Sequence, residues 1–219
     1  MDLYFYPLAC SLASRIALYE AQAPVRFIEV DSKTKRTLVN EEPFLDVHPL
    51  GLVPVLRTDA GEILTENAAV LQHIADAFPS AGLAPASGIE RSRLHEWLCF
   101  IGTELHKGLF VPLLDERASD AAKHYALERY RPRMAYLEQR LQGREFLLDR
   151  FSVADAYLFV VLSWSVVTPI KLASYPNIHS YHERLRKRPS IARAFSEELP
   201  LFQQEQSRHG KAQLSAAAL

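Results

Sequence analysis

The sequence predicts two domains of different class, a small α/β domain followed by an all-helical domain. Over the first 78 residues, short strand patterns alternate with apolar residues at helical spacing. Prolines, serines and a glycine then gather at 79–87, as in a linker, and no strand pattern follows them. We therefore expect an α/β domain over 1–78, a linker at 79–87 and a helical domain over 88–219.

The first domain opens with a β-α-β unit. Residues 2–7 are rich in aromatic side chains and end at a proline, and 25–30 form a second strand pattern. Between them, apolar residues recur at helical spacing over 12–19. Two strands joined by such a helix are expected to pair in parallel with a right-handed crossover.

The rest of this domain completes the order βαβαββα. A short irregular helix is expected at 44–45, before the turn residues of 48–51. The strands predicted at 54–57 and 62–64 are separated by Thr-Asp-Ala-Gly, a hairpin signal that indicates antiparallel pairing. Apolar residues over 70–78 mark the last helix.

The second domain shows only helical patterns. One amphipathic helix is predicted at 94–105 and another at 127–141, which Pro132 should kink or restart. Ser152 and Asp155 have the spacing of a capping box at the start of the most apolar helix.

Two further helices are predicted near the C-terminus. Pro176 and Pro189 stand where first-turn prolines would open them. The tail from Gln203 is polar and then alanine-rich, and we interpret it as mobile.

Composition argues against several classes of protein. The formal net charge is −1 and the basic residues form no block, which argues against a nucleic-acid partner. The second residue is acidic and no basic segment follows, so no signal peptide is expected. The apolar stretch 151–170 contains Asp155 and Pro169, which favours a buried helix over a membrane span. Two cysteines form no disulfide framework, as expected of a reduced, cytoplasmic protein.

The candidate reactive group is the thiol of Cys10. It follows the first strand and precedes the first helix, where free amides and the helix dipole favour a thiolate and should lower the thiol pKa. The alternative is a small buried hydrophobe. Val53-Pro54 stands where thioredoxin-like folds place a cis proline, whose neighbour offers its backbone to a peptide-like ligand; the sequence leaves the isomer open.

Cys10 lacks the second cysteine of a C-x-x-C pair, since the run is Cys-Ser-Leu-Ala. Any disulfide formed at Cys10 must therefore be resolved by an outside thiol. In the cytoplasm that thiol is most often glutathione.

Three motifs together resemble the cytosolic glutathione transferase superfamily, and within it the bacterial beta class. They are Ala-Cys-Ser-Leu-Ala-Ser at 9–14, Thr-Glu-Leu-His-Lys at 103–107, and Ser-Val-Ala-Asp-Ala-Tyr-Leu-Phe at 152–159 with Trp164 downstream. The resemblance covers about residues 1–198. It implies a thioredoxin-like domain joined to a helical domain, a homodimer, and an enzyme that uses glutathione as co-substrate without a permanently bound cofactor.

The resemblance implies roles for individual residues. Cys10 and His106 would be catalytic, with Cys10 contacting or bonding the glutathione sulfur and His106 donating a hydrogen bond nearby. Lys35 would reach the glycyl carboxylate, and the Val53 backbone would pair with the cysteinyl part. Taken alone, His106 has the ordinary interpretation of a helix-surface histidine, and Lys35 that of a solvated lysine.

Further residues complete the implied site. Glu66 and Asn67 would hold the γ-glutamyl group at the start of a helix, although an acidic first turn has a structural explanation too. Thr103 and Glu104 would reach the glutathione of the neighbouring subunit. Trp164 would line the pocket for an apolar second substrate, although a lone aromatic residue in an apolar helix more often lies in the core.

The sequence departs from the beta-class pattern at three positions. Leu8 replaces the usual glycine two residues before the cysteine, and Asn67 replaces glycine or serine. Cys99 stands where asparagine is common, at the start of a predicted stripe with Thr103 and His106 that would face the dimer cleft. These changes put the details of glutathione binding in doubt.

Two function classes remain open. The first is an enzyme of detoxification that conjugates glutathione to electrophiles or exchanges disulfides through Cys10, and cysteine at this position favours exchange. The second is a non-catalytic ligand-binding or regulatory protein on the same scaffold. No metal site is predicted, because the eight histidines form no His-x-x-x-His or His-Glu-x-x-His pair.

Overall fold

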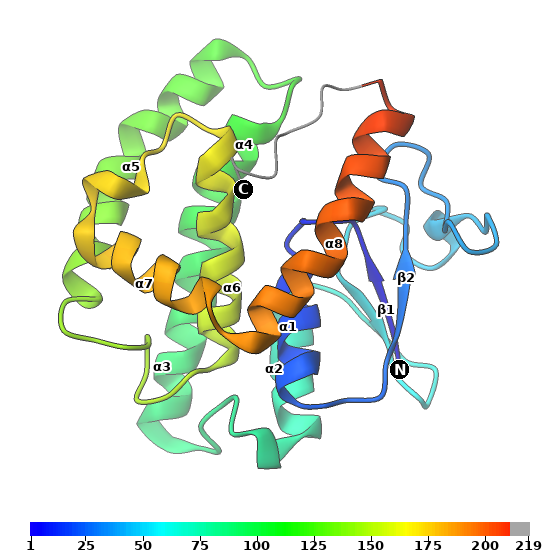
Figure 1. The fold of residues 1–219 in the computed structure, drawn as a ribbon, viewed down its shortest axis with the longest axis horizontal. Coiled ribbons are helices and arrows are strands. Elements are labelled where there is room, and N and C mark those ends of the chain that lie inside the picture. The colour runs from blue at the N-terminus through cyan, green and yellow to red at the C-terminus, as the bar shows by residue number, and fades with distance from the viewer. Residues whose placement is uncertain (211–219) are drawn as a thin grey trace. The chain divides into compact units, whose positions relative to one another are not determined.

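The computed structural model describes residues 1–210, and the chain divides into two compact units. Figure 1 colours the chain by residue number, from blue at the N-terminus to red near the C-terminus. Unit 1 combines Met1–Leu83 with the segment that begins at Pro189, and unit 2 is Ala84–Arg188. Across the described residues, no helix combines the length and the apolar character needed to span a membrane.

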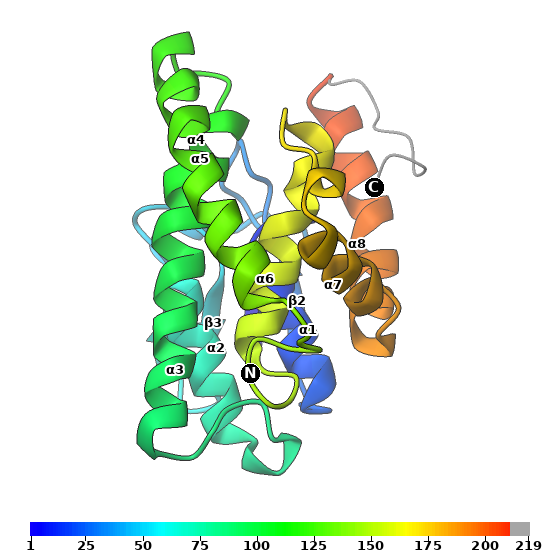
Figure 2. The ribbon, with the colours of Figure 1, turned by 90° about the vertical axis from the view of Figure 1, so that its left-hand side faces the viewer.

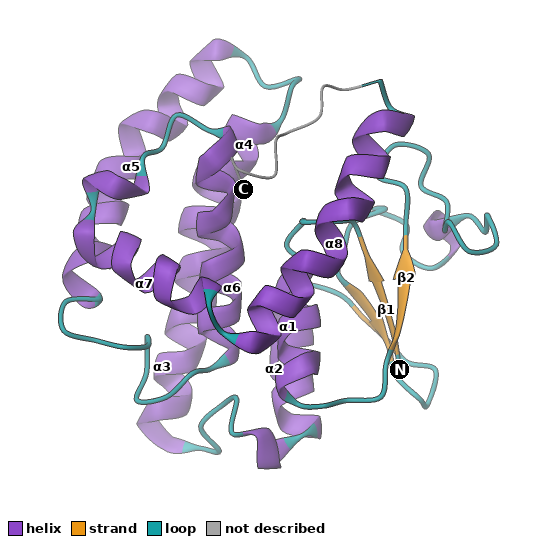
Figure 3. Cartoon of the chain, in the orientation of Figure 1, coloured by secondary structure: helices purple, strands orange, loops and turns teal. Residues whose placement is uncertain are grey.

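Unit 1 contains a mixed four-stranded sheet in the order β2-β1-β3-β4, drawn as arrows in Figure 3. β1 (Asp2–Phe5) pairs in parallel with β2 (Arg26–Glu29) and antiparallel with β3 (Val55–Arg57). β3 also pairs antiparallel with β4 (Ile63–Leu64). The predicted parallel pairing of the first two strands and antiparallel pairing of the last two are both confirmed.

Helices pack beside this sheet. α1 (Leu12–Glu20) and α2 (Asn67–Ala77) contact each other, and apolar side chains of both are fully buried. The irregular helix expected at 44–45 is a 3-10 turn at Phe44–Asp46. Phe44 is buried against Tyr4 of β1, with ring centroids 5.5 Å apart.

The C-terminal helix groups with unit 1. Residues 88–219 are expected from the sequence to form one helical domain, but α8 (Pro189–Arg208) packs on α1 within unit 1. Arg15 Nε donates to Glu198 Oε1 at 2.7 Å, and the two side chains are 4% and 0% exposed. Apolar periodicity cannot reveal this pairing, because the partners lie 183 residues apart in the sequence.

The tail interpreted as mobile from Gln203 onward is helical as far as Arg208. The part of that tail at 211–219 lies outside the described residues.

Unit 2 is built from helices, seen from a second side in Figure 2. α3 (Gly88–Cys99) runs directly into a π-helical segment, η3 (Phe100–Phe110), and then into the short α4 (Val111–Leu114). α5 (Asp120–Arg140) and α6 (Val153–Ser163) both pack against η3. α5 continues through Pro132, where the sequence predicts a kink or restart.

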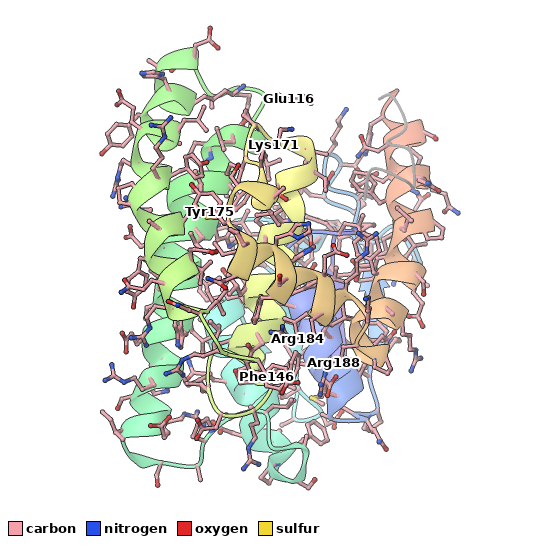
Figure 4. All side chains as sticks on the ribbon, turned by 60° about the vertical axis from the view of Figure 1, so that its left-hand side comes forward. Glu116, Phe146, Lys171, Tyr175, Arg184 and Arg188 are labelled. Carbon is pink, nitrogen blue, oxygen red and sulfur yellow. The ribbon has the colours of Figure 1, made fainter. Side chains whose placement is uncertain are left out.

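α7 (Pro176–Arg186) is the last helix of unit 2 along the chain and begins at the predicted first-turn proline. Arg184 Nη2 donates to the Glu145 carbonyl at 2.6 Å. The Arg188 guanidinium lies 4.0 Å from the centre of the Phe151 ring, which in turn packs edge-on against Phe146. Figure 4 labels Arg184, Arg188 and Phe146 at this end of the unit.

The predicted capping box at the start of α6 is present. The Ser152 amide donates to Asp155 Oδ2 at 2.9 Å, and in return the backbone amide of Asp155 donates to the Ser152 side chain. Asp155 is fully buried and accepts two more hydrogen bonds at Oδ1, from the Leu147 amide (2.8 Å) and the Tyr181 hydroxyl (2.7 Å). This carboxylate joins three segments of unit 2 around the start of α6.

Ser152→Ala is expected to lower the free energy of unfolding by about 0.5–2 kcal/mol, the range for losing a helix cap. The helix that it caps is buried from Val153 to Leu162, so the loss should act on the whole unit. Denaturant titration measures the change, with Ser119→Ala as the matched control. Ser119 caps the exposed start of α5, so its loss should cost less; equal midpoints for Ser152→Ala and the parent chain would contradict the cap.

Candidate functional site

Cys10 lies in the turn between β1 and α1. Its Sγ is 3.2 Å from the carbonyl oxygen of Val53, and the residue is buried at 8% exposure. The next residue, Ser11, occupies the N-cap position of α1, although its hydroxyl donates to the Tyr6 carbonyl and does not cap the helix. Cys10 therefore stands just outside the helix. The lowered thiol pKa that the sequence suggests stays a prediction.

The bond between Val53 and Pro54 is cis, which assigns the isomer that the sequence left open. Val53 is half-buried and its carbonyl faces the thiol. Two residues that the sequence selects for one site, Cys10 and Val53, therefore do meet across the end of the sheet.

Lys35 differs from its charged neighbours. Its side chain is half-buried whereas Lys33 and Arg36 are exposed. The Lys35 Nζ lies 2.8 Å from the hydroxyl of Tyr6, and that hydroxyl donates to the Gly51 carbonyl. Burial lowers the pKa of Lys35, opposed by the charges of Glu205 and Asp31.

Tyr6 is a functional candidate that sequence reasoning missed. It belongs to the aromatic run that was interpreted only as a strand, and it lies just beyond the end of β1. Its hydroxyl orients the Lys35 ammonium, which also lies 4.7 Å from the centre of the Tyr6 ring. The aromatic run itself carried no signal that would distinguish this tyrosine from Tyr4 of the core.

Glu66 and Asn67 stand at the start of α2, as expected. Glu66 is exposed and has a positive φ of 65°, immediately before the first helical residue. The buried Asn67 side chain is used within the chain: Nδ2 donates to the Cys10 carbonyl at 3.1 Å, and Oδ1 accepts from Ser14 Oγ at 3.1 Å. Asn67 therefore braces the turn that carries the thiol.

In unit 2, the predicted stripe of Cys99, Thr103 and His106 is only partly formed. Cys99 and Thr103 are exposed and joined, since Thr103 Oγ1 donates to the Cys99 carbonyl at 2.9 Å. His106 is buried instead. The π-helical segment η3 has i→i+5 spacing, which shifts later residues away from the α-helical register on which the stripe was based.

Gly108 explains how the wider turn is accommodated. A Cβ at this position would lie 2.7 Å from the Thr103 carbonyl oxygen five residues earlier. A larger residue would therefore force this segment apart. Nothing in the spacing of apolar residues marks such a turn, because the side-chain pattern of η3 still contains a buried apolar face.

Glu104 is half-buried and ion-paired within unit 2. Its Oε2 lies 2.7 Å from Arg133 Nε and 2.5 Å from Arg133 Nη2, on α5. Glu104 therefore ties η3 to α5.

His106 and Trp164 come together at the end of α6. Their ring centroids are 5.0 Å apart, and Trp164 also contacts Phe110 edge-on at 6.0 Å. The Nδ1 of His106 lies 2.6 Å from the hydroxyl oxygen of Tyr157. Burial, assisted by the charge of Lys107, lowers the pKa of His106 to about 4, so the imidazole is neutral near pH 7.

Two family models match successive parts of the chain. The glutathione S-transferase N-terminal domain matches residues 8–82, and the glutathione S-transferase C-terminal domain matches 103–198. The chain belongs to the glutathione S-transferase family. The transferase is 37% identical to glutathione S-transferase GstA of Escherichia coli O157:H7, over 90% of this chain and 98% of that protein.

Solved structures agree with this assignment. The transferase is 44% identical to a sphingomonad glutathione S-transferase solved in complex with glutathione, with a TM-score of 0.86. It is 42% identical, again with a TM-score of 0.86, to a bacterial beta-class glutathione S-transferase of Sphingomonas chungbukensis. Both matches cover 90% of this chain and 98% of the other. The resemblance to the beta class is confirmed.

Among the described residues, one group of side chains has the atoms and the spacing to hold a metal ion. It consists of Asp31, Glu205 and His209. Asp31 Oδ1 accepts two backbone amides, and Oδ2 lies 3.0 Å from His209 Nε2 and 3.6 Å from Arg208 Nε. The Ser32 amide donates to Glu205 Oε1 at 3.0 Å. We interpret the group as an ion-paired tether for α8, and the expectation that the transferase needs no metal stays a prediction.

Between about pH 6.5 and pH 4, His106 and His182 are expected to make acidification destabilising, whereas Glu198, whose pKa burial raises to about 7, contributes in the opposite direction. Burial lowers the pKa of both histidines to about 4 from 6.5, so each imidazole binds more protons in the unfolded chain than in the folded chain in this window. Each histidine thus contributes a loss of about 3 kcal/mol once the pH has fallen through its folded pKa. Unfolding measured from pH 7 to pH 4 tests this by comparison, because the change in unfolding free energy on acidification is expected to be about 3 kcal/mol less destabilising in His182→Phe than in the parent chain. The same change in both chains would contradict the assignment for His182.

Proposed function

We propose that this protein is a glutathione transferase, which binds glutathione at the end of the sheet in unit 1 and transfers it, or its reducing equivalents, to small electrophilic or disulfide substrates. The observation that carries the proposal is the thiol of Cys10 placed 3.2 Å from the Val53 carbonyl, beside a cis proline. A similar chain was solved with glutathione bound. Glutathione acts here as co-substrate, with no permanently bound cofactor.

Four residues of unit 1 define the proposed subsites. The Val53 backbone pairs with the cysteinyl part of glutathione, as an extended peptide pairs with a free strand edge. The Lys35 ammonium, oriented by Tyr6, binds the glycyl carboxylate. The carboxylate of Glu66 and the backbone of Asn67 hold the γ-glutamyl group at the start of α2; the Asn67 side chain is already used at Cys10 and Ser14.

The proposed exchange reaction uses Cys10 as nucleophile. The Cys10 thiolate attacks one sulfur of a disulfide, the S–S bond breaks, and the other sulfur leaves as a thiolate. Glutathione thiolate then attacks the mixed disulfide and releases Cys10 as a thiolate. Conjugation instead uses the sulfur of glutathione itself, which bonds to an electrophilic carbon and displaces its leaving group.

The roles proposed in unit 2 rest on the family resemblance. His106 is the second catalytic residue and donates a hydrogen bond to the sulfur. Trp164 lines the pocket for the apolar substrate. Thr103 and Glu104 approach the glutathione of the neighbouring subunit in a homodimer.

We further infer that the homodimer works in the cytoplasm in detoxification, with no nucleic-acid or membrane partner. In support of an interface, unit 1 exposes apolar side chains on the segment between β2 and β3, with Val39 78% and Leu50 70% exposed. Sedimentation is expected to give about twice the chain mass of 24.8 kDa. A species of single-chain mass at micromolar concentration would contradict the dimer.

The competing function is a non-catalytic ligand carrier or regulatory protein on the same scaffold. Immobilised glutathione followed by assays with a chromogenic electrophile and a small disulfide separates the two. The proposed function predicts retention and turnover in at least one assay. Retention without turnover would support the carrier, and failure in both would reject the glutathione site.

A further inference from the structure

The buried hydroxyl of Tyr157 is hydrogen-bonded to the imidazole of His106. The residue is 3% exposed and its oxygen lies 2.6 Å from the His106 Nδ1, with the two rings nearly perpendicular at 89°. His106 is itself 6% exposed, so the hydrogen bond is shielded from water. Such a short contact inside the unit constrains where the single proton of a neutral imidazole sits.

A neutral imidazole carries its proton on one nitrogen and offers a lone pair on the other. The Tyr157 hydroxyl can donate to Nδ1 or accept from it, but a phenol is a better donor than acceptor because its oxygen lone pair is delocalised into the ring. When the hydroxyl donates, Nδ1 is the acceptor and the proton must be on Nε2. The same logic fixes the tautomer of metal-binding and catalytic histidines through the partner of their other nitrogen.

The surroundings hold this pair in place. Tyr157 belongs to α6, whose start is fixed by Ser152 and Asp155. The π-helical register of η3 turns His106 into the interior, where Trp164 packs on it at 5.0 Å. Because α6 and η3 both belong to unit 2, the geometry of the pair depends on that unit alone.

We propose that Tyr157 is a positioning residue that holds His106 in the tautomer protonated on Nε2, the form able to donate a hydrogen bond to a sulfur anion. The inference rests on the proposed function for its consequence, since the anion in question is the thiolate of glutathione. The opposite tautomer would present a lone pair to that thiolate and repel it. Tyr157 thus acts through His106 and does not itself touch the sulfur.

Tyr157→Phe is the direct variant, because it removes only the hydroxyl. Nitrogen NMR of the histidine rings is expected to show the Nε2-protonated form for His106 in the parent chain and a mixture of tautomers in the variant. With glutathione bound, the ultraviolet absorbance of the thiolate should appear about one pH unit higher in the variant. The kcat/KM for conjugation near neutral pH should fall about tenfold.

Tyr181→Phe is the matched control. It also removes a buried hydroxyl in unit 2, hydrogen-bonded to Asp155 at 2.7 Å, but it does not contact His106. It should lower stability while leaving the thiolate titration and the His106 tautomer unchanged. In a His106→Ala background, Tyr157→Phe should have no further effect on the titration, since the two residues act as one unit.

The outcomes separate this inference from the proposed function. His106 protonated on Nδ1 in the parent chain would overturn the inference whatever the activity. An unchanged thiolate titration in Tyr157→Phe, or an equal shift in Tyr181→Phe, would also overturn it. A parent chain that shows the Nε2 tautomer, lost in Tyr157→Phe, but does not bind glutathione would support the tautomer assignment and reject the proposed function instead.

Discussion

Replacing Cys10 with alanine is expected to abolish disulfide exchange, a loss of at least about a thousandfold, because a nucleophilic thiol is removed from the reaction. The other cysteine, Cys99, is exposed at the end of α3 and is not part of the turn that carries Cys10. Conjugation should fall less, because glutathione brings its own sulfur. Paired assays of exchange and conjugation on the same preparation measure the two losses.

The matching experiment traces the covalent intermediate. Oxidised glutathione should leave one glutathionyl adduct on the folded protein, located at Cys10, and mass spectrometry of peptides identifies its position. Cys99→Ala is the control and should keep both the adduct and the exchange activity. Cys99 is the more exposed of the two thiols, so an adduct confined to Cys99 would show that exposure alone decides reactivity and would reject Cys10 as nucleophile.

Replacing Glu198 with alanine is expected to lower the free energy of unfolding by about 3–5 kcal/mol, the cost of leaving a buried charge without its partner. Glu198 Oε1 accepts from Arg15 Nε at 2.7 Å, and Oε2 accepts from the Leu8 amide at 2.7 Å. The lower end of the range is favoured, because Glu197 Oε2 remains 3.2 Å from Arg15 Nη1. Denaturant titration and thermal melting measure the loss.

Glu197→Ala is the matched control for this change. Glu197 sits beside Glu198 on α8 and also contacts Arg15, but its side chain is 39% exposed and should contribute less than about 1 kcal/mol. Glu198→Ala should in addition weaken glutathione binding. Glu198 accepts from the amide of Leu8, which has a positive φ of 57° and lies two residues before Cys10, so its loss should disturb the turn that carries the thiol. Equal stabilities of the two variants would contradict a buried ion pair as the main tether of α8.

The local elements of the fold were predictable because their signals are local. The β-α-β unit, the hairpin before β4, the cap at Ser152 and the first-turn prolines each depend on residues within a few positions of one another. The docking of α8 depends on Arg15 and Glu198, which are distant in sequence and have charged side chains that usually face water. The sequence pattern around these two charged residues gives no reason to expect their burial, so the packing of α8 on α1 could not be predicted.

Part of the candidate site was also predictable from the sequence. The sequence places Cys10 after the first strand and Val53 before the proline of the third, and Cys10 Sγ does lie 3.2 Å from the Val53 carbonyl oxygen. The roles of these residues and of Lys35 in glutathione binding stay predictions. Tyr6 was missed because a hydroxyl on an aromatic strand residue looks like any other core tyrosine. The burial of His106 could not be predicted, because it depends on the π-helical register of η3. That register brings the Thr103 carbonyl close to Gly108, and the spacing of apolar residues in the sequence does not reveal it.

Calorimetric titration of the protein with reduced glutathione tests the central claim most directly. We predict one binding site per chain, weakened at least about tenfold by Lys35→Ala, since the glycyl carboxylate of glutathione would lose the ammonium that Tyr6 orients. Lys33→Ala, an exposed lysine two residues away, should bind as the parent chain does. No binding to the parent chain, or equal affinities for the two variants, would contradict a glutathione site built around Cys10, Val53 and Lys35.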